Sequence, residues 1–142
     1  MKKIGLKDLT AYQQDVIHGK ICPYCKSVPQ LKPQNYVYGK KYNDRLLMVC
    51  KNWPTCDSYV GCDDNDFPLG RLAKWKLRLA KKDAHYHFDH LWRTDKMKRN
   101  QAYKELSNHL GLSKDLCHIG MMGLKSCENT KQWAIIKFQT FI

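Results

Sequence analysis

The longest amphipathic pattern in the chain lies just past its midpoint. Apolar or small side chains recur there at steps of three and four positions: Leu69, Ala73, Leu77, Ala80, Ala84, Phe88 and Leu91. Such spacing places these positions along one face of an α-helix. The sequence therefore predicts a helix of about six turns from Leu69 to Leu91, with one buried stripe.

Shorter patterns of the same kind predict three more helices. One runs through Leu9, Tyr12, Val16 and Ile17, and another through Ala102, Tyr103, Leu106 and Leu110. Gly111 follows the second of these, and glycine is the usual residue just past a helix end. The C-terminal segment 130–142 predicts a last helix that packs against the core.

The first half of the chain carries strand signals instead. Segments 35–38 (NYVY) and 45–50 (RLLMVC) are β-prone, and Gly39 and Asn43–Asp44 supply turn residues between them. A β-hairpin is therefore predicted over residues 35–50. Because helices follow the hairpin along the chain, the expected fold class is α+β.

Four cysteines frame this hairpin. Cys22 and Cys25 form a C-x2-C pair, Cys50 and Cys56 form a C-x5-C pair, and 24 residues separate the pairs. Each pair encloses a proline, which stiffens its turn by fixing φ. Two thiolate pairs can close a tetrahedral Zn²⁺ site with no open position for catalysis. We therefore predict a zinc ribbon in which Zn²⁺ organises the fold.

Two other uses of these cysteines stay open, namely a redox-active dithiol and buried thiols without a ligand. Disulfides are not expected, because seven is an odd number of cysteines and no signal peptide or membrane span is predicted. We expect a cytoplasmic protein. Its predicted parts are a zinc ribbon with a short N-terminal helix over residues 1–66 and a helical part over 67–142, packed as one compact unit.

The composition adds a strong positive charge. The chain has 25 Lys and Arg against 13 Asp and Glu, a formal net charge of +12. Such a surplus implies an anionic partner, most often nucleic acid. The alternative is a basic surface that serves solubility. A zinc ion with four thiolates carries a net −2, which would leave about +10.

The charge is clustered on the predicted long helix. Five basic side chains gather on an arc of roughly 100° away from the apolar stripe: Arg71, Lys74, Arg78, Lys81 and Lys82. Like charges three and four positions apart repel one another, and a phosphate backbone would relieve that repulsion. A plain solvated helix face is the alternative. Trp75 flanks this face and could stack on a base or cover the core. The remaining candidates for nucleic-acid binding lie in the ribbon: Lys40, Lys41 and Trp53.

A histidine-rich segment lies further along the same helix. It holds His85, His87, Asp89 and His90, and His85 shares a helix face with Asp89. A possible second metal site combines part of this segment with more distant residues: Cys62, His85, His118 and Cys127. Structural histidines and buried thiols are the alternative, and a hydrolytic centre is a third interpretation.

The segments CPYC (22–25) and CKNWPTC (50–56) resemble the zinc ribbons at the C-terminal end of bacterial type IA DNA topoisomerases. The resemblance covers about residues 21–60 and implies that the four cysteines of these segments are the zinc ligands. Since that family holds single-stranded DNA with its ribbons, it implies a similar use here. The chain departs from the family in a longer hairpin and in the additional Cys62.

A wider set of motifs resembles a family of small bacterial and phage proteins described as zinc-finger-containing. The motifs are CPYC, YVGC (59–62), PLG (68–70), FDHLW (88–92), AY (102–103) and HIG (118–120), with Cys127. This resemblance implies a zinc-binding protein of bacterial or phage origin and carries no mechanism. Asp63 stands where a histidine is expected after YVGC, which counts against Cys62 and Asp63 as part of a second metal site.

Together these patterns predict a non-enzymatic zinc protein that binds nucleic acid, DNA rather than RNA. No base-reading helix motif stands out, so little sequence specificity is expected. Two alternatives remain. One is a metal-dependent nuclease centred on His85, Asp89 and His118, for which the sequence offers few carboxylates. The other is an adaptor of a phage or mobile element that binds a host protein through the same basic face.

Overall fold

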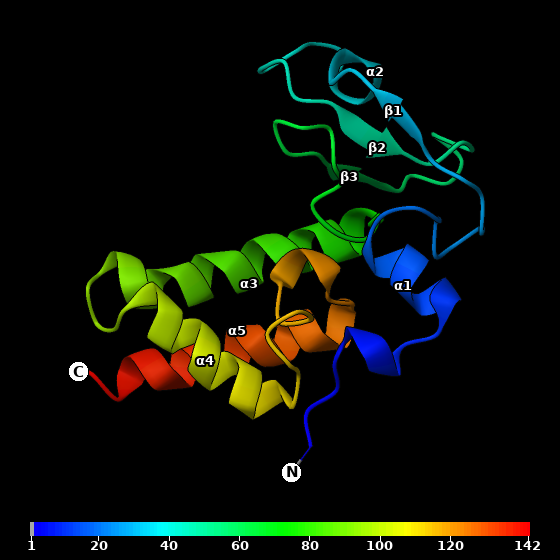
Figure 1. Ribbon diagram of the computed structural model, residues 1–142. Helices are drawn as coiled ribbons and strands as arrows, with labels where there is room; N and C mark the ends of the chain where they lie inside the picture. The colour runs from blue at the N-terminus through cyan, green and yellow to red at the C-terminus, as the bar shows by residue number, and fades with distance from the viewer. Residues whose placement is uncertain (1) are drawn as a thin grey trace. The chain divides into compact units, whose positions relative to one another are not determined.

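The computed structural model describes residues 2–142 and divides the chain into two compact units, shown in Figure 1. The sheet unit is Thr10–Trp75. The helical unit combines the residues up to Leu9 with Lys76–Ile142. The sequence suggested two consecutive segments that meet after residue 66, whereas the contacts place the limits of the units at Leu9 and Trp75. The α+β class is confirmed.

The sheet unit is built on three short antiparallel strands. They are β1 (Gln30–Lys32), β2 (Leu47–Val49) and β3 (Tyr59–Gly61), in the order β1-β2-β3. Met48 of β2 lies opposite Leu31 of β1 and Val60 of β3. The predicted strand 45–50 is thus confirmed as β2. The third strand was not predicted.

The segment NYVY is a short helix, so the predicted strand over residues 35–38 is wrong. In α2 (Asn35–Tyr38) the Tyr36 N–H donates to the Pro33 carbonyl at 3.0 Å, and the Tyr38 N–H donates to Gln34 at 2.8 Å. Gly39 ends the helix at φ +77°, a left-handed conformation that glycine adopts without a steric penalty. Pro33 precedes this turn, and its ring fixes φ near the helical value, which favours a helical turn over a strand. The first strand of the sheet therefore lies before Pro33.

Gln34 explains how this turn is held. Its side chain is 7% exposed, and its Oε1 accepts the backbone N–H groups of Tyr42 and Asn43 at 2.8 and 3.1 Å. Its Nε2 donates to Asn43 Oδ1 at 2.7 Å. One glutamine therefore closes the loop between α2 and β2 and outweighs the β-propensity of NYVY.

Helix α1 (Ala11–Ile17) confirms the predicted N-terminal helix of the sheet unit. Its N-terminus is a capping box, in which the Thr10 side chain accepts from the Gln13 N–H and the Gln13 side chain accepts from the Thr10 N–H. Val16 and Ile17 are its buried residues.

The helical unit contains α3 (Trp75–Arg93), α4 (Arg99–Leu110) and α5 (Leu124–Gln139), together with the short 3-10 helices η1 (Leu6–Asp8) and η2 (Ile119–Met121). Phe88 and Leu91 of α3, Leu106 of α4 and Ala134 of α5 are fully buried. The Phe88 ring packs edge-on against Tyr103 at 4.7 Å. None of the helices in residues 2–142 is long and apolar enough to cross a membrane.

The long helix begins six residues later than the apolar spacing predicted. Residues 69–74 lie outside the helix, and Ala73 among them exchanges backbone hydrogen bonds with Tyr59 at 3.2 and 3.0 Å. The Leu69 N–H likewise donates to Gly61. Leu69 is 54% exposed and does not belong to the buried stripe. Hydrogen bonds to the backbone of β3 therefore hold this segment beside the sheet, and Arg71 and Lys74 lie outside the helix.

The two later helices overlap their predicted positions, and α4 ends where predicted. Gly111 ends α4 at φ +68°, as expected. Helix α5 begins at Leu124, six residues before the predicted segment. Near the N-terminus, Ile4 pairs with the chain beyond α4, since its N–H donates to the Gly111 carbonyl and its carbonyl accepts from Ser113.

Candidate metal centre and basic surfaces

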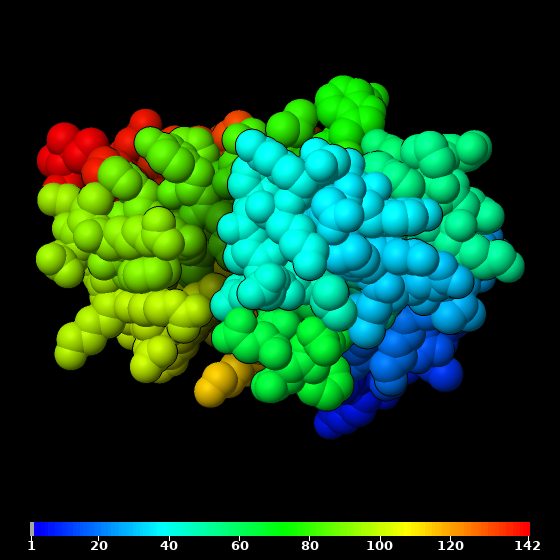
Figure 2. Space-filling model, turned by 90° about the horizontal axis from the view of Figure 1, so that it is seen from above, coloured from blue at the N-terminus to red at the C-terminus, as the bar shows by residue number. Residues whose placement is uncertain are grey.

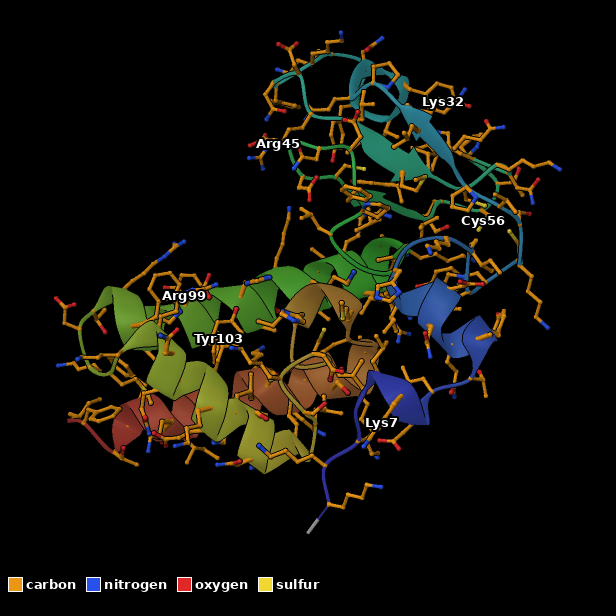
Figure 3. All side chains as sticks on the ribbon, viewed as in Figure 1. Lys7, Lys32, Arg45, Cys56, Arg99 and Tyr103 are labelled. Carbon is orange, nitrogen blue, oxygen red and sulfur yellow. The ribbon has the colours of Figure 1, made fainter. Side chains whose placement is uncertain are left out.

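The four framing cysteines come together in the sheet unit. All of their sulfur atoms lie within 4.8 Å of one another, with Cys22 and Cys56 at 3.7 Å and Cys25 and Cys50 at 3.3 Å. Sulfurs at a Zn–S distance of about 2.3 Å in a tetrahedron are roughly 3.8 Å apart. The donor set and its spacing therefore fit Zn²⁺. Figure 3 marks Cys56 in this group.

Each cysteine pair sits on a tight turn. In the first, the Cys22 N–H donates to the Ser27 carbonyl at 2.9 Å, and the Lys26 N–H returns to the Cys22 carbonyl at 2.8 Å. Lys26 takes φ +63° to make this turn. In the second, the Cys56 N–H donates to the Asn52 carbonyl at 2.9 Å. Backbone hydrogen bonds thus fix where the sulfurs point.

Hydrogen-bond donors surround the exposed side of the site. The Asn52 amide lies 3.4 Å from Cys25 Sγ, and its backbone N–H lies 3.4 Å from Cys50 Sγ. The Cys25 thiol donates to the Ser27 hydroxyl oxygen at 3.2 Å, and hydrogen bonding with Ser27 is the largest cause that lowers the pKa of Cys25 to about 6. Hydrogen bonds donated to sulfur favour the thiolate, which is the form that binds metal.

Burial acts in the opposite direction on the second pair. It raises the pKa of Cys50 to about 12 and also raises the pKa of Cys56. Zn²⁺ must therefore displace protons from these two thiols when it binds. Since four cysteines fill a tetrahedral shell, the ion would have no position for water or substrate, and its role is structural.

The metal site also forms a buried cluster of the sheet unit. This cluster consists of Cys22, Cys50, Cys56 and Leu72, with Met48 and Val60 packed against it. The three strands are only three residues long each, and strands this short gain little stability by themselves. Metal binding therefore contributes directly to the folding of this unit.

Sequence reasoning missed the serines that support the sulfurs. Ser58 is fully buried, and its Oγ lies 3.1 Å from Cys22 Sγ and 3.5 Å from Cys56 Sγ. Ser27 plays the matching part beside Cys25. The signal was available, because each pair ends in the same C-x-S pattern, Cys25-Lys26-Ser27 and Cys56-Asp57-Ser58.

A three-stranded sheet that carries a four-cysteine site on two turns defines a zinc-finger protein. The chain belongs to the family described as zinc-finger-containing domain, whose model matches residues 18–137. The match includes all four cysteines and most of the helical unit. A search of the curated proteins and a search of the solved structures each found no match. The similarity to topoisomerase ribbons and the phage origin stay predictions.

The second metal site has no support within the part of the chain that the structure describes. In that part, the four framing cysteines are the only group of three or more His, Cys, Asp or Glu side chains close enough together to hold an ion. Cys62 belongs to the sheet unit, whereas His85, His118 and Cys127 belong to the helical unit. Burial raises the pKa of Cys62 to about 11, so this thiol stays protonated.

The predicted neighbours His85 and Asp89 do lie on one face of α3. His85 Nδ1 is 3.6 Å from Asp89 Oδ2, and the same oxygen is 3.9 Å from Arg93. The aspartate thus has two basic neighbours on its own helix, an arrangement typical of a surface ion pair. His118 is not brought to them in any group that could hold a metal within residues 2–142.

The predicted basic residues fall into two sets. Arg71 and Lys74 lie in the segment of the sheet unit before α3, and the Lys74 ammonium lies 5.0 Å from the centre of the Tyr24 ring. Arg78, Lys81 and Lys82 lie on α3, where Lys82 is exposed. Trp75, at the first position of α3, is 54% exposed, so it does not cover the core.

The ribbon candidates also lie at the surface. Lys41 is exposed, the Lys40 ammonium lies 4.8 Å from the centre of the Tyr42 ring, and Trp53 is partly exposed beside Tyr59. In the view of Figure 2, α2 and the loop that follows it, drawn in cyan, form the face of the sheet unit turned to the reader.

Proposed function

We propose that this protein binds nucleic acid, DNA in the first instance, without catalysing a reaction, and that its helical unit provides most of the attraction to phosphates. The zinc-bound sheet unit serves as a rigid platform for further contacts. This function rests on how the charge is distributed over the two units.

Most of the positive charge belongs to the helical unit. It contains 16 of the 25 Lys and Arg and 7 of the 13 Asp and Glu, a net +9, whereas the sheet unit has 9 and 6, a net +3. A zinc ion with four thiolates lowers the latter to about +1. A unit with a large excess of one sign attracts polyanions and releases their counterions on binding.

The absence of acids at the start of the long helix supports the same function. Arg78, Lys81 and Lys82 lie within two turns of α3, whose first turn holds no acidic residue. Exposed helices normally place opposite charges four positions apart. Phosphates would compensate this cluster, and each neutralised phosphate adds about 0.9 to the slope of log affinity against log salt for duplex DNA.

The test is a salt titration of DNA binding by the full chain, measured by fluorescence anisotropy. The paired variant Arg78→Glu/Lys82→Glu should weaken binding and make the salt slope shallower by about 2. The control Lys20→Glu/Lys32→Glu changes the net charge equally but lies in the sheet unit outside the cysteine turns, and it should change the slope by less than half as much.

Binding that does not depend on salt, or equal effects of both paired variants, would contradict the proposal. Salt-independent binding would instead favour a protein partner, such as a host protein, for the basic surface. Cleavage of DNA that requires magnesium and is lost in His85→Ala with the fold intact would favour the nuclease.

A further inference from the structure

Four aromatic rings form a continuous row on the sheet unit. Tyr42 contacts Tyr38 with ring centres 5.7 Å apart, Tyr38 contacts Tyr59 at 5.8 Å, and Tyr59 contacts Trp53 at 5.7 Å. We call Tyr42, Tyr38, Tyr59 and Trp53 the aromatic row. Its members come from the loop after α2, from α2, from β3 and from the turn between Cys50 and Cys56. The row therefore extends from the hairpin loop to the metal site.

The aromatic row is not part of the core. The buried cluster of this unit holds three of the four cysteines and Leu72, and none of the four rings belongs to it. Tyr42 is 68% exposed and Tyr38 is 42% exposed, while Tyr59 and Trp53 are partly exposed. Four neighbouring rings at the surface of a small unit form the kind of patch that marks a binding site.

Cations accompany both ends of the row. The Lys40 ammonium lies over the Tyr42 ring at 4.8 Å, and Lys41 is the residue between them. At the other end, the exposed Lys51 precedes Trp53 by two positions. Rings that offer π-faces beside lysines are the combination that binds unpaired nucleotides, since bases stack on the rings and phosphates meet the cations.

We propose that the aromatic row binds the unpaired bases of a single DNA strand. This inference rests on the proposed function, and it adds the form of the ligand. The faces of bases in a duplex are covered by their neighbours, so rings on a protein surface can stack only on bases that are unstacked and unpaired. The aromatic row thus favours single-stranded over duplex DNA, while the basic side chains of the helical unit attract the phosphates of both.

The geometry limits how many bases the row binds. Neighbouring rings are inclined at 76°, 81° and 81° to one another, so adjacent members present their faces in different directions. Two similarly oriented bases of one strand therefore cannot stack on two adjacent members of the row. Tyr42 and Tyr38 expose the most surface and should contribute most.

The experiment compares two ligands with the same backbone charge. One is an oligodeoxythymidylate, and the other is an oligonucleotide of equal length whose sugars carry no bases. The full chain, purified with its zinc, should bind the thymidylate more tightly, because only that ligand can stack. Tyr42→Ala should lower its affinity for the thymidylate about 5- to 150-fold and leave the abasic affinity unchanged.

Two kinds of variant act as controls. Tyr12→Ala removes a ring that is 43% exposed, close to the exposure of Tyr38, but lies on α1 outside the aromatic row, and it should change neither affinity. Tyr42→Phe keeps the ring without the hydroxyl and should retain the wild-type preference. Tyr38→Ala provides a second position, and its zinc content and circular dichroism report whether the unit is intact.

The outcomes separate this inference from the proposed function. If the protein binds both ligands equally and Tyr42→Ala changes neither affinity, the aromatic row does not stack on bases, although nucleic-acid binding stands. If the protein binds neither ligand nor duplex DNA, the proposed function fails and this inference fails with it. A loss of abasic binding in Tyr42→Ala would also overturn the inference, because the effect would then not involve bases.

Discussion

Ser58 offers the most direct test of how the metal site is supported. Its side chain is fully buried, and its hydroxyl lies 3.1 Å from Cys22 Sγ and 3.5 Å from Cys56 Sγ. In the zinc-bound site both sulfurs are thiolates, so the hydroxyl donates to them. The substitution Ser58→Ala removes this donor with little change in volume and leaves no room for a replacing water.

The expected loss follows from this geometry. A hydroxyl has a single proton, so it makes one hydrogen bond at a time, to one thiolate or the other. A hydrogen bond to a charged group contributes about 1.5–3 kcal/mol. Ser58→Ala should therefore weaken zinc binding by about 10- to 150-fold, in keeping with the 10- to 100-fold effects of substitutions behind metal ligands.

The assay is a competition for zinc between the protein and a chromophoric chelator at fixed pH. Ser27→Ala is the matched control, because its hydroxyl lies 3.2 Å from Cys25 Sγ but the sulfur is exposed, so water can replace the donor. It should weaken zinc binding by less than tenfold. A Ser58→Ala protein with native circular dichroism and unchanged zinc affinity would refute the reasoning.

Three further predictions concern stability. Removal of zinc with a strong chelator should abolish the structure of the sheet unit, where the metal site joins two cysteine turns in a buried cluster, while most of the helical circular dichroism remains. Full retention of the structure of both units would show that the fold does not depend on metal. Gly19→Ala should lower the free energy of unfolding more than Gly111→Ala, as measured with urea. Both glycines have positive φ, but a Cβ at Gly19 would lie 2.6 Å from Pro68, whereas at Gly111 it would meet open space and cost about 1–2 kcal/mol. Lys137 lies 2.7 Å from Glu105 and lowers the pKa of that carboxyl. The pKa of Glu105 is thus lower in the folded than in the unfolded protein. The pair therefore stabilises the protein fully when the pH is above the unfolded-state pKa, and this stabilisation is lost as the pH falls through the folded-state pKa of Glu105. Glu105→Gln should reduce stability at pH 7 by about 0.2–1 kcal/mol but not at pH 2, and the exposed Glu128→Gln should change neither value.

The sequence was informative where one local rule acts alone. Four cysteines in two short-spaced pairs predicted a metal site, and the structure brings their sulfurs within 4.8 Å of one another. The stripe from Leu77 to Leu91 likewise predicted the buried face of α3. Gly111 marked the end of α4, because its left-handed conformation is a local property of the chain.

The errors arose where distant residues override a local preference. Asn35–Tyr38 is β-prone, yet the Gln34 side chain closes the loop with Tyr42 and Asn43 and leaves this segment helical. Ala73 continues the helical spacing of apolar residues, yet it forms two backbone hydrogen bonds with Tyr59 and lies outside the helix. Neither contact can be predicted from the spacing of apolar residues, since each joins residues that belong to different predicted elements or loops.

The aromatic row was beyond sequence analysis for the same reason. Its members occupy positions 38, 42, 53 and 59, and no fixed spacing connects them. They become neighbours only because α2 and the turn of the second cysteine pair flank the same short sheet. Trp53 was visible as a candidate, but its contact with Tyr59, and through it with the rest of the row, depends on the fold.

The pairing of Ile4 with the segment after α4 has a consequence for synthesis on the ribosome. Ile4 forms backbone hydrogen bonds with Gly111 and Ser113, so one partner is translated more than a hundred residues after the other. At 5–20 residues per second, this delay lasts about 5–20 s. The whole sheet unit, with all four zinc ligands, emerges in the interval. Zinc can thus bind to the sheet unit before the helical unit folds. Without zinc, the sheet unit would still be unfolded when the two separate segments of the helical unit have to pack together.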